Sequence, residues 1–303
     1  MEFRFLGTTG LHVSRLGLGL AEIGQELADR PEEAERLLNT ALDRGINFLD
    51  TAAMYGPSEE MIGKYVSARR DWVVLATKAG QATAGYGGED WTYRTVADSI
   101  DRSLRRLRTT NIDLVQLHSC GVDVLKRGEA IRALQDARQA GKARFIGYSG
   151  DNEAAEWAVE SGLFDTLQTT FNLLDQRAAT RLFPRARENK MGIIAKRPIA
   201  NSAWGAPPDA SKPTRRWDDI HPRAQAMQAM GPLPGAPEDR IELALGFTLA
   251  HKEVDSAIVG TKSPEHLQSN VRMYERRPPL RRETVHELRR RFEEIGGDWP
   301  QIS

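Results

Sequence analysis

Cysteine is almost absent from this chain, and that absence narrows the chemistry open to it. Cys120 is the only cysteine among 303 residues, which excludes an internal disulfide framework and a zinc site built from several cysteines. A single cysteine is compatible with a reducing compartment. We expect Cys120 to pack in a loop, with a redox-sensitive thiol as the alternative, and we expect no bound metal.

An excess of charge of either sign is also lacking. Lys plus Arg number 42 and Asp plus Glu number 42, so the formal net charge is zero. A neutral chain gives no overall reason to bind nucleic acid or an anionic membrane. No apolar run approaches the roughly 18 residues of a membrane span, and the residues after Met1 lack the apolar core of a secretory signal. We expect a soluble cytoplasmic protein of undetermined oligomeric state.

What the chain does contain is a regular alternation of short apolar runs and helical patterns. The turn signal Gly7-Thr8-Thr9-Gly10 predicts an N-terminal β-hairpin. Strands are predicted at residues 16–20, 46–49, 72–77, 113–117, 144–148, 166–170, 192–195 and 256–259. Helices are predicted at residues 31–44, 95–107, 129–139, 153–160, 176–188, 238–250 and 264–273.

This alternation indicates an α/β fold of parallel strands with crossover helices. Eight strand-helix units are what a closed (β/α)₈ TIM barrel needs, and such a barrel accommodates residues 1–303 as one domain. An open doubly wound sheet is the rival, but no G-x-G-x-x-G loop follows the first strand. We expect the long loop at 200–237 and the tail from residue 280 to lie over the barrel mouth.

Polar residues follow three consecutive predicted strands, where active sites of such barrels lie. Asp50 ends the second strand and Tyr55 follows in the loop, Lys78 comes after the third strand, and His118 after the fourth. The ends of consecutive strands are neighbours, so these side chains should converge. Each has an ordinary structural explanation, such as a capped turn or a core ring, and only the combination favours a catalytic site.

The four residues together suit reduction of a carbonyl group. The oxygen gains negative charge and needs a proton, which the Tyr55 hydroxyl can donate although its pKa is ordinarily about 10. An ammonium ion 4 Å away, here Lys78, contributes roughly 4 kcal/mol at an effective dielectric of 20 and should lower that pKa. Asp50 would hold Lys78 charged and oriented, and His118 would donate a hydrogen bond to the carbonyl oxygen.

Two motifs carry a resemblance to the aldo-keto reductase family that extends over nearly the whole chain. Residues 5–19, FLGTTGLHVSRLGLG, are similar to its N-terminal hairpin signature, and residues 47–56, NFLDTAAMYG, with Ser58-Glu59, resemble its most specific motif. The resemblance implies a (β/α)₈ barrel, NAD(P)H as cofactor, and an Asp-Tyr-Lys-His tetrad. The tetrad maps onto Asp50, Tyr55, Lys78 and His118.

The resemblance also implies cofactor contacts. The family holds the nicotinamide carboxamide with a Ser-Asn pair and a Gln, which correspond here to Ser149, Gly150 and Gln168, so one amide is missing. No stacking aromatic follows the seventh strand, where Lys196-Arg197-Pro198 stand. The remaining expected cofactor contacts are Gly19, Gly260, Thr261, Lys262, Ser263, His266 and Asn270.

Lys262 and Ser263 lie just before a predicted helix, where a cation, hydroxyl groups and helix N–H groups suit the 2′-phosphate of NADPH. That favours NADPH over NADH, although a solvated Lys beside a Ser cap is the ordinary alternative. Met54, Trp204 and Trp299 are the expected substrate contacts, with Trp217 as a further candidate wall residue.

Three functions remain open. The first is reduction of a small aldehyde or ketone by NADPH. The second is a reductase-like subunit that holds cofactor and regulates a partner, which the complete tetrad disfavours. The third is NADP-dependent oxidation of a sugar or alcohol, because the tetrad serves both directions.

Overall fold

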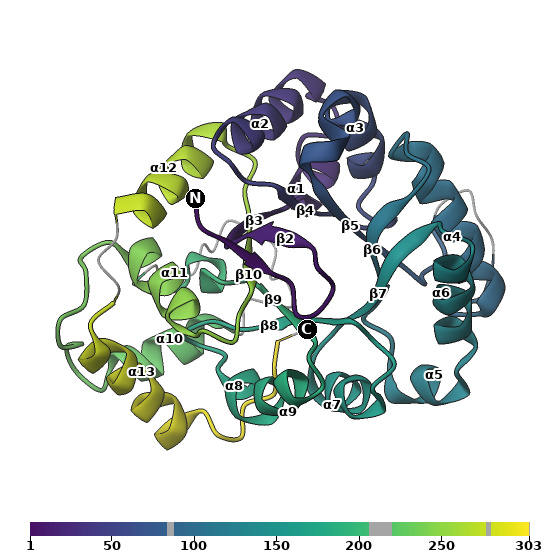
Figure 1. Cartoon of the computed structure of the whole chain (residues 1–303). Helices are drawn as coiled ribbons and strands as arrows, with labels where there is room; N and C mark the ends of the chain where they lie inside the picture. Colours follow the sequence, from purple (N-terminus) through teal and green to yellow (C-terminus); the bar gives the residue numbers. More distant parts are fainter. Residues whose placement is uncertain (84–87, 206–219, 277–279, 303) are drawn as a thin grey trace.

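The computed structural model describes residues 1–83, 88–205, 220–276 and 280–302. Eight parallel strands close into a barrel in the order β10-β3-β4-β5-β6-β7-β8-β9, and helices surround it (Figure 1). The (β/α)₈ barrel predicted from the alternation is therefore confirmed. The strands are β3 Leu16–Gly19, β4 Phe48–Asp50, β5 Val74–Ala79, β6 Ile112–His118, β7 Ala143–Ser149, β8 Thr166–Thr170, β9 Gly192–Lys196 and β10 Ser256–Gly260.

The helical layer contains more elements than the sequence pattern indicates. The helices are α1 Ala21–Gln25, α2 Pro31–Asp43, α3 Ser58–Tyr65, α4 Tyr93–Arg106, α5 Val122–Arg127, α6 Glu129–Gln139, α7 Asn152–Ser161, α8 Arg177–Arg181, α9 Phe183–Glu188, α10 Ile220–Gln228, α11 Arg240–Ala250, α12 Pro264–Arg276 and α13 Arg282–Ile295. Short 3₁₀ segments, η1 Ser67–Trp72 and η2 Ala200–Ser202, complete the set. None of the helices in the described ranges is long and apolar enough to cross a membrane.

Several predicted boundaries were wrong for identifiable reasons. The helix expected at 176–188 is divided at Leu182 into α8 and α9, and Pro184, which lacks an N–H group, stands in the first turn of α9. The short helices α1, α3, α5 and α10 were missed because nine residues or fewer give a weak periodic signal. The predicted irregular loop at 200–237 contains α10, and Trp217 lies outside the described residues. Strand β5 continues through Lys78 to Ala79, past the polar residue at which the apolar run appeared to end.

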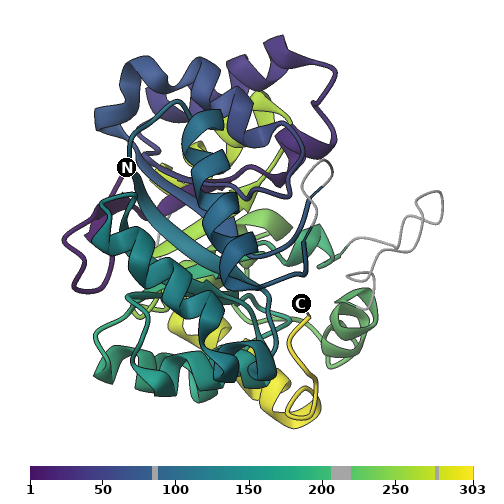
Figure 2. The same ribbon diagram turned by 90° about the vertical axis from the view of Figure 1, so that its right-hand side faces the viewer.

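The N-terminal hairpin, β1 Phe3–Phe5 and β2 His12–Ser14, closes one end of the barrel. Leu6, Leu11 and Val13 of the hairpin pack with inward-facing strand residues such as Phe48 and Ile258 in one apolar cluster. Figure 2 shows the hairpin and the C-terminus at opposite ends of the barrel. The strands therefore present their carboxyl ends at the mouth that the hairpin leaves open.

Leu6 should be the residue on which this closure depends most. Its side chain is fully buried, so we expect Leu6→Ala to lower the free energy of unfolding by about 2–5 kcal/mol. Phe5→Ala, at a side chain that is 64% exposed, is the control and should cost less than about 1 kcal/mol. Urea denaturation of both variants measures the difference, and equal losses would contradict the proposed closure.

Candidate active site

Asp50 and Lys78 form a buried ion pair at the open mouth of the barrel. The Lys78 Nζ donates to the Asp50 Oδ2 at 2.6 Å and to the Thr51 carbonyl oxygen at 2.9 Å, and both charged side chains are almost fully buried. Strands β4 and β5 are paired with Asp50 opposite Ala76, so adjacent strands bring the two charges together. Burial by itself would lower the pKa of Lys78, but the Asp50 carboxylate and then Tyr55 outweigh it and raise that pKa above its usual value. Lys78 therefore stays protonated.

Asp50 is also fixed by two glutamines that point into the barrel. The Gln168 Nε2 donates to the Asp50 Oδ1 at 2.8 Å, and the Gln116 Nε2 approaches the same oxygen at 3.5 Å. The Ser149 hydroxyl donates to the Gln168 Oε1 at 2.8 Å. A hydrogen-bonded chain thus runs from Ser149 through Gln168 and Asp50 to Lys78. Gln116 was missed in the sequence, although its place two residues before His118, on the same face of one strand, could have indicated it.

Tyr55 lies in the tight loop between β4 and α3, which several contacts immobilise. The Tyr55 N–H donates to the Ala52 carbonyl oxygen, and the Tyr55 carbonyl oxygen accepts from the Ser58 N–H, both at 3.0 Å. Helix α1 packs directly on this loop, because a Cβ added to Gly24 would lie 1.7 Å from the Tyr55 carbonyl oxygen. Any larger residue at Gly24 would displace the Tyr55 main chain.

A second layer of polar contacts stands behind the Tyr55 loop and was not predicted from the sequence. The buried Glu59 accepts a hydrogen bond of 2.7 Å from the Thr77 hydroxyl, next to Lys78. The Arg106 guanidinium lies 3.6 Å from Glu59 and donates to the Ala53 carbonyl oxygen. Ser58-Glu59 belongs to the motif that resembles the family. The Glu59 side chain fastens the loop to β5 and α4, whereas the Ser58 hydroxyl donates to the Leu20 carbonyl oxygen at 2.9 Å.

The four predicted catalytic residues are brought together. The Lys78 Nζ lies 5.1 Å from the centroid of the Tyr55 ring. The Tyr55 and His118 rings meet edge to face, with centroids 5.7 Å apart and an interplanar angle of 83°. Asp50, Tyr55, Lys78 and His118 thus form one cluster. The Trp91 Nε1 donates to the His118 carbonyl oxygen at 3.3 Å, a contact that the sequence did not indicate.

The pKa of Tyr55 differs in direction from the one that the charges in the sequence suggested. Burial raises the pKa of Tyr55 above its usual value, and the opposing attraction of Lys78 does not cancel that increase. Lys78 does lower the pKa of Tyr55 as expected, but the sequence argument left out desolvation, which is the larger effect and makes the net direction upward. Burial, followed by the nearby Lys78, Lys196 and Arg197 cations, holds the pKa of His118 well below its usual value. His118 is consequently a neutral imidazole with one N–H donor.

The predicted nicotinamide contacts lie on adjacent strands, with Ser149 paired opposite Gln168. Gly150 follows β7, and a Cβ there would lie 2.4 Å from the Tyr148 hydroxyl oxygen. That hydroxyl donates to the Cys120 carbonyl oxygen at 2.7 Å. The Tyr148 phenol thus occupies the space of a side chain at position 150, which gives a physical reason for the departure from the family pattern.

Asn152 does not replace the missing amide, because the C-terminal tail engages it. Its Nδ2 donates to the Gln301 carbonyl oxygen at 3.1 Å, and its Oδ1 accepts from the Gln301 N–H at 2.8 Å. The Asn152 N–H in turn donates to the Gln301 Oε1 at 3.0 Å. Gln301 therefore docks on the start of α7 through three reciprocal hydrogen bonds.

The segment Lys196-Arg197-Pro198 follows β9 and is bound to the same region. Lys196 forms an ion pair of 2.8 Å with the buried Asp151, a residue that the sequence did not single out despite its place just after β7. The Arg197 Nη1 donates to the Thr170 hydroxyl at 2.7 Å and to the Ile302 carbonyl oxygen at 2.6 Å. The Pro198 carbonyl oxygen accepts from the Thr248 hydroxyl at 3.0 Å. Main chain and side chains of this segment are thus fixed to the barrel rim.

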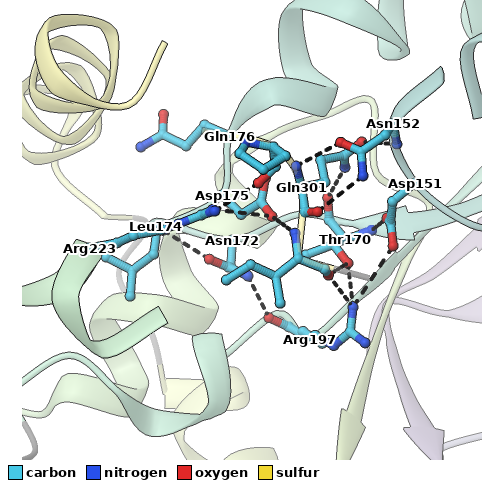
Figure 3. Close-up of polar contacts among 12 residues, drawn as sticks. Asp151, Asn152, Thr170, Asn172, Leu174, Asp175, Gln176, Arg197, Arg223 and Gln301 are labelled. Carbon is cyan, nitrogen blue, oxygen red and sulfur yellow. Dashed lines mark hydrogen bonds and ion pairs between the residues drawn. The ribbon is translucent and has the colours of Figure 1, made fainter. Parts of the chain in front are cut away.

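Figure 3 shows Asp151, Asn152, Thr170 and Arg197 gathered around the C-terminal tail near Gln301. The Arg223 Nη2 of α10 donates to the Pro300 carbonyl oxygen at 2.8 Å. The Ile302 N–H donates to the Asp175 Oδ2 at 2.9 Å. The expectation that the tail reaches the mouth is therefore confirmed. Burial raises the pKa of the Asp175 carboxyl to about 7, although the Ile302 N–H opposes the change.

The expected adenosine contacts lie at the junction of β10 and α12. Gly260 pairs opposite Gly19 of β3, and the Ser263 hydroxyl accepts from the His266 N–H at 3.1 Å. Lys262 and His266 are exposed, whereas Asn270 is buried. The Thr261 hydroxyl accepts from the Ser263 N–H at 3.1 Å. The structure therefore brings this predicted set together on one loop and the first turns of one helix.

The predicted substrate contacts occupy different environments. Met54 is 45% exposed beside Tyr55, whereas Trp204 is buried within the main apolar cluster. Trp299 packs edge to face on Phe292 of α13, and the Arg223 guanidinium lies 5.1 Å from its ring centroid. Trp299 therefore anchors the tail. Cys120 is buried, and burial raises the pKa of its thiol to about 12, as expected for loop packing.

The Asp175 carboxyl should make the stability of the fold depend on pH. Its folded pKa of about 7 exceeds its ordinary value of 3.8, so the folded chain binds more protons than the unfolded chain. The stabilising contribution is complete below pH 3.8 and is lost as the pH rises through about 7. We expect Asp175→Asn to gain in stability relative to the unsubstituted chain between pH 5 and pH 8, by about 2–3 kcal/mol. Urea unfolding at both pH values measures this, and an unchanged difference would refute it.

Comparison with known proteins agrees with this arrangement. The model of the aldo/keto reductase family matches residues 15–290. YqkF, an oxidoreductase of Bacillus subtilis (strain 168), is 30% identical over 288 residues, which cover 89% of this chain and 90% of that protein. L-galactose dehydrogenase of Arabidopsis thaliana is 31% identical over 287 residues, covering 89% of this chain and 87% of its own length.

A solved structure extends the likeness to three dimensions. The holo form of aldo-keto reductase AKR11C1 from Bacillus halodurans superposes with a TM-score of 0.81 and 27% sequence identity, covering 96% of each chain. The closed barrel, the hairpin and the matching family model thus agree. The chain belongs to the aldo/keto reductase family and is an oxidoreductase.

Proposed function

We propose that this enzyme reduces an aldehyde or ketone to the alcohol with NADPH, and that Tyr55 is the general acid. The observation that carries the proposal is the buried Asp50–Lys78 pair of 2.6 Å beside the Tyr55 and His118 rings. Burying an ammonium ion costs free energy, because the ion loses its hydration. A role for Lys78 in proton donation by the neighbouring phenol of Tyr55 gives a functional reason for that cost.

The residues at the mouth have the chemistry that a nicotinamide dinucleotide needs. Ser149 and Gln168 offer a hydroxyl and an amide, side by side, for a carboxamide. Lys262 and the N–H groups at the start of α12 suit a phosphate. The fit is less complete at Gly150, where no side chain can contribute, and the carboxamide would be held by Ser149 and Gln168 without a second amide.

The roles of the side chains follow from their positions. The reduced nicotinamide supplies the hydride to the carbonyl carbon when the cofactor is bound. The neutral His118 donates a hydrogen bond that orients the carbonyl oxygen, and the Tyr55 hydroxyl gives that oxygen a proton as its charge grows. Lys78 stabilises the resulting phenolate, and Asp50 keeps Lys78 in place. Because burial disfavours a charged phenol, the cation offsets a cost that would otherwise slow proton transfer.

Oxidation of an alcohol or sugar is the second candidate, since each step can run in reverse with Tyr55 as the base. A relative named L-galactose dehydrogenase favours it. A purely regulatory subunit is less well supported, because such a subunit has no need of a buried Lys78 held beside Tyr55.

Replacement of the Tyr55 hydroxyl tests the mechanism. We expect the full chain to consume NADPH with some members of a panel of aldehydes and ketones, measured by loss of the reduced-cofactor absorbance. Tyr55→Phe should lower kcat by at least about 100-fold while the Kd for NADPH stays within a factor of about two, because the ring and its packing remain.

Tyr274→Phe is the matched control, because its hydroxyl meets Glu2 near the N-terminal end of the chain, and it should leave kcat unchanged. Turnover that survives Tyr55→Phe would refute the assignment of the general acid. Cofactor binding without turnover on the whole panel, in either direction, would instead favour the regulatory subunit.

A further inference from the structure

Lys262, the cation expected to meet the 2′-phosphate of NADPH, already has a carboxylate partner. Its ammonium group forms an ion pair with Glu26, which follows the short helix α1. The Ser263 hydroxyl, the second group expected at that phosphate, donates to the Glu265 Oε2 at 2.8 Å. The two side chains expected to bind the 2′-phosphate, Lys262 and Ser263, thus both contact acidic residues instead.

The topology of the barrel explains why α1 faces this junction. Strands β3 and β10 are neighbours that pair through Gly19 and Gly260, so the segment after β3 lies against the loop after β10. A Cβ added to Gly260 would lie 2.4 Å from the Glu22 Oε1. Glu22 therefore contacts the main chain of this loop, and Glu26 reaches over to Lys262.

Three carboxylates, those of Glu22, Glu26 and Glu265, therefore gather at a place where the sequence predicts an anion. A phosphate monoester carries about −1.5 to −2 charges at pH 7, so a 2′-phosphate would have to take Lys262 from Glu26 and lie close to the displaced carboxylate. An unphosphorylated ribose bears no charge and can donate its 2′-hydroxyl to a carboxylate, as acidic residues accept it in other dinucleotide sites.

We propose that Glu26 is a specificity-determining residue, which competes with the 2′-phosphate for Lys262 and thereby narrows the preference of the enzyme for NADPH over NADH. This inference rests on the proposed function, because it requires that the β10–α12 junction bind the adenosine end of the cofactor. The pyrophosphate and the nicotinamide are common to NADH and NADPH, so their contacts cancel in the comparison.

The size of the effect follows from the exposure of the pair. The side chains of Lys262 and Glu26 are 54% and 36% exposed, and exposed ion pairs contribute little. Loss of the pair and of the repulsion between Glu26 and the phosphate should together tighten NADPH binding by roughly five- to tenfold.

The decisive experiment measures cofactor binding in the absence of substrate. Fluorescence titration gives the Kd of NADPH and NADH for the full chain and for Glu26→Gln, at a low ionic strength of about 0.05 M where charges are weakly screened. We expect Glu26→Gln to lower the Kd of NADPH roughly five- to tenfold and to change the Kd of NADH by less than about twofold.

Two further variants separate a local effect from a change of net charge. Glu160→Gln alters the charge equally at an exposed residue of α7, away from this junction, and should leave both Kd values unchanged. In a Lys262→Ala background, Glu26→Gln should give a smaller gain for NADPH, because no cation remains to be released.

Each outcome bears on the inference. Equal changes in the two Kd values, or no change for NADPH, would overturn the role of Glu26 while leaving the proposed reductase intact. A full gain in the Lys262→Ala background would also overturn competition for that cation. If the unsubstituted chain bound neither cofactor, the proposed function itself would fail, and this inference with it.

Discussion

The buried ion pair between Asp50 and Lys78 is the interaction on which the polar cluster at the barrel mouth depends. Two charges removed from water are stable only when each is paired and hydrogen-bonded. The barrel provides this by placing them on adjacent strands, with Gln168 and the Thr51 carbonyl oxygen as further partners. Tyr55 and His118 then pack against a cation whose position is fixed, and their protonation follows from that position and from burial.

Three lysines at the mouth are each paired with a carboxylate from a neighbouring segment of the chain. Asp50 pairs with Lys78, Asp151 with Lys196, and Glu26 with Lys262. The positive charge of each of these lysines is thus balanced by a carboxylate of the chain itself.

The two ends of the barrel have different tasks. The hairpin fills one end with apolar side chains such as Leu6. At the other end, the docked tail joins α7, α10 and the rims of β7 to β9 through Gln301 and its neighbours. The closed end is therefore apolar, whereas the mouth contains buried polar groups that are hydrogen-bonded to one another.

The sequence by itself determined the alternation of strands and helices, and hence the barrel, because periodicity and turn residues are local signals. It also predicted which polar side chains lie together at the mouth, since Asp50, Lys78 and His118 mark the ends of consecutive strands. Only the tertiary structure decided how those groups titrate, because desolvation of Tyr55 depends on everything packed around it. The same holds for Gly150 beside Tyr148, for Asn152 bound by Gln301, and for Lys262 paired with Glu26. Each of these contacts depends on how separate parts of the chain pack in space. The residues on either side of a position in the sequence do not predict such a contact.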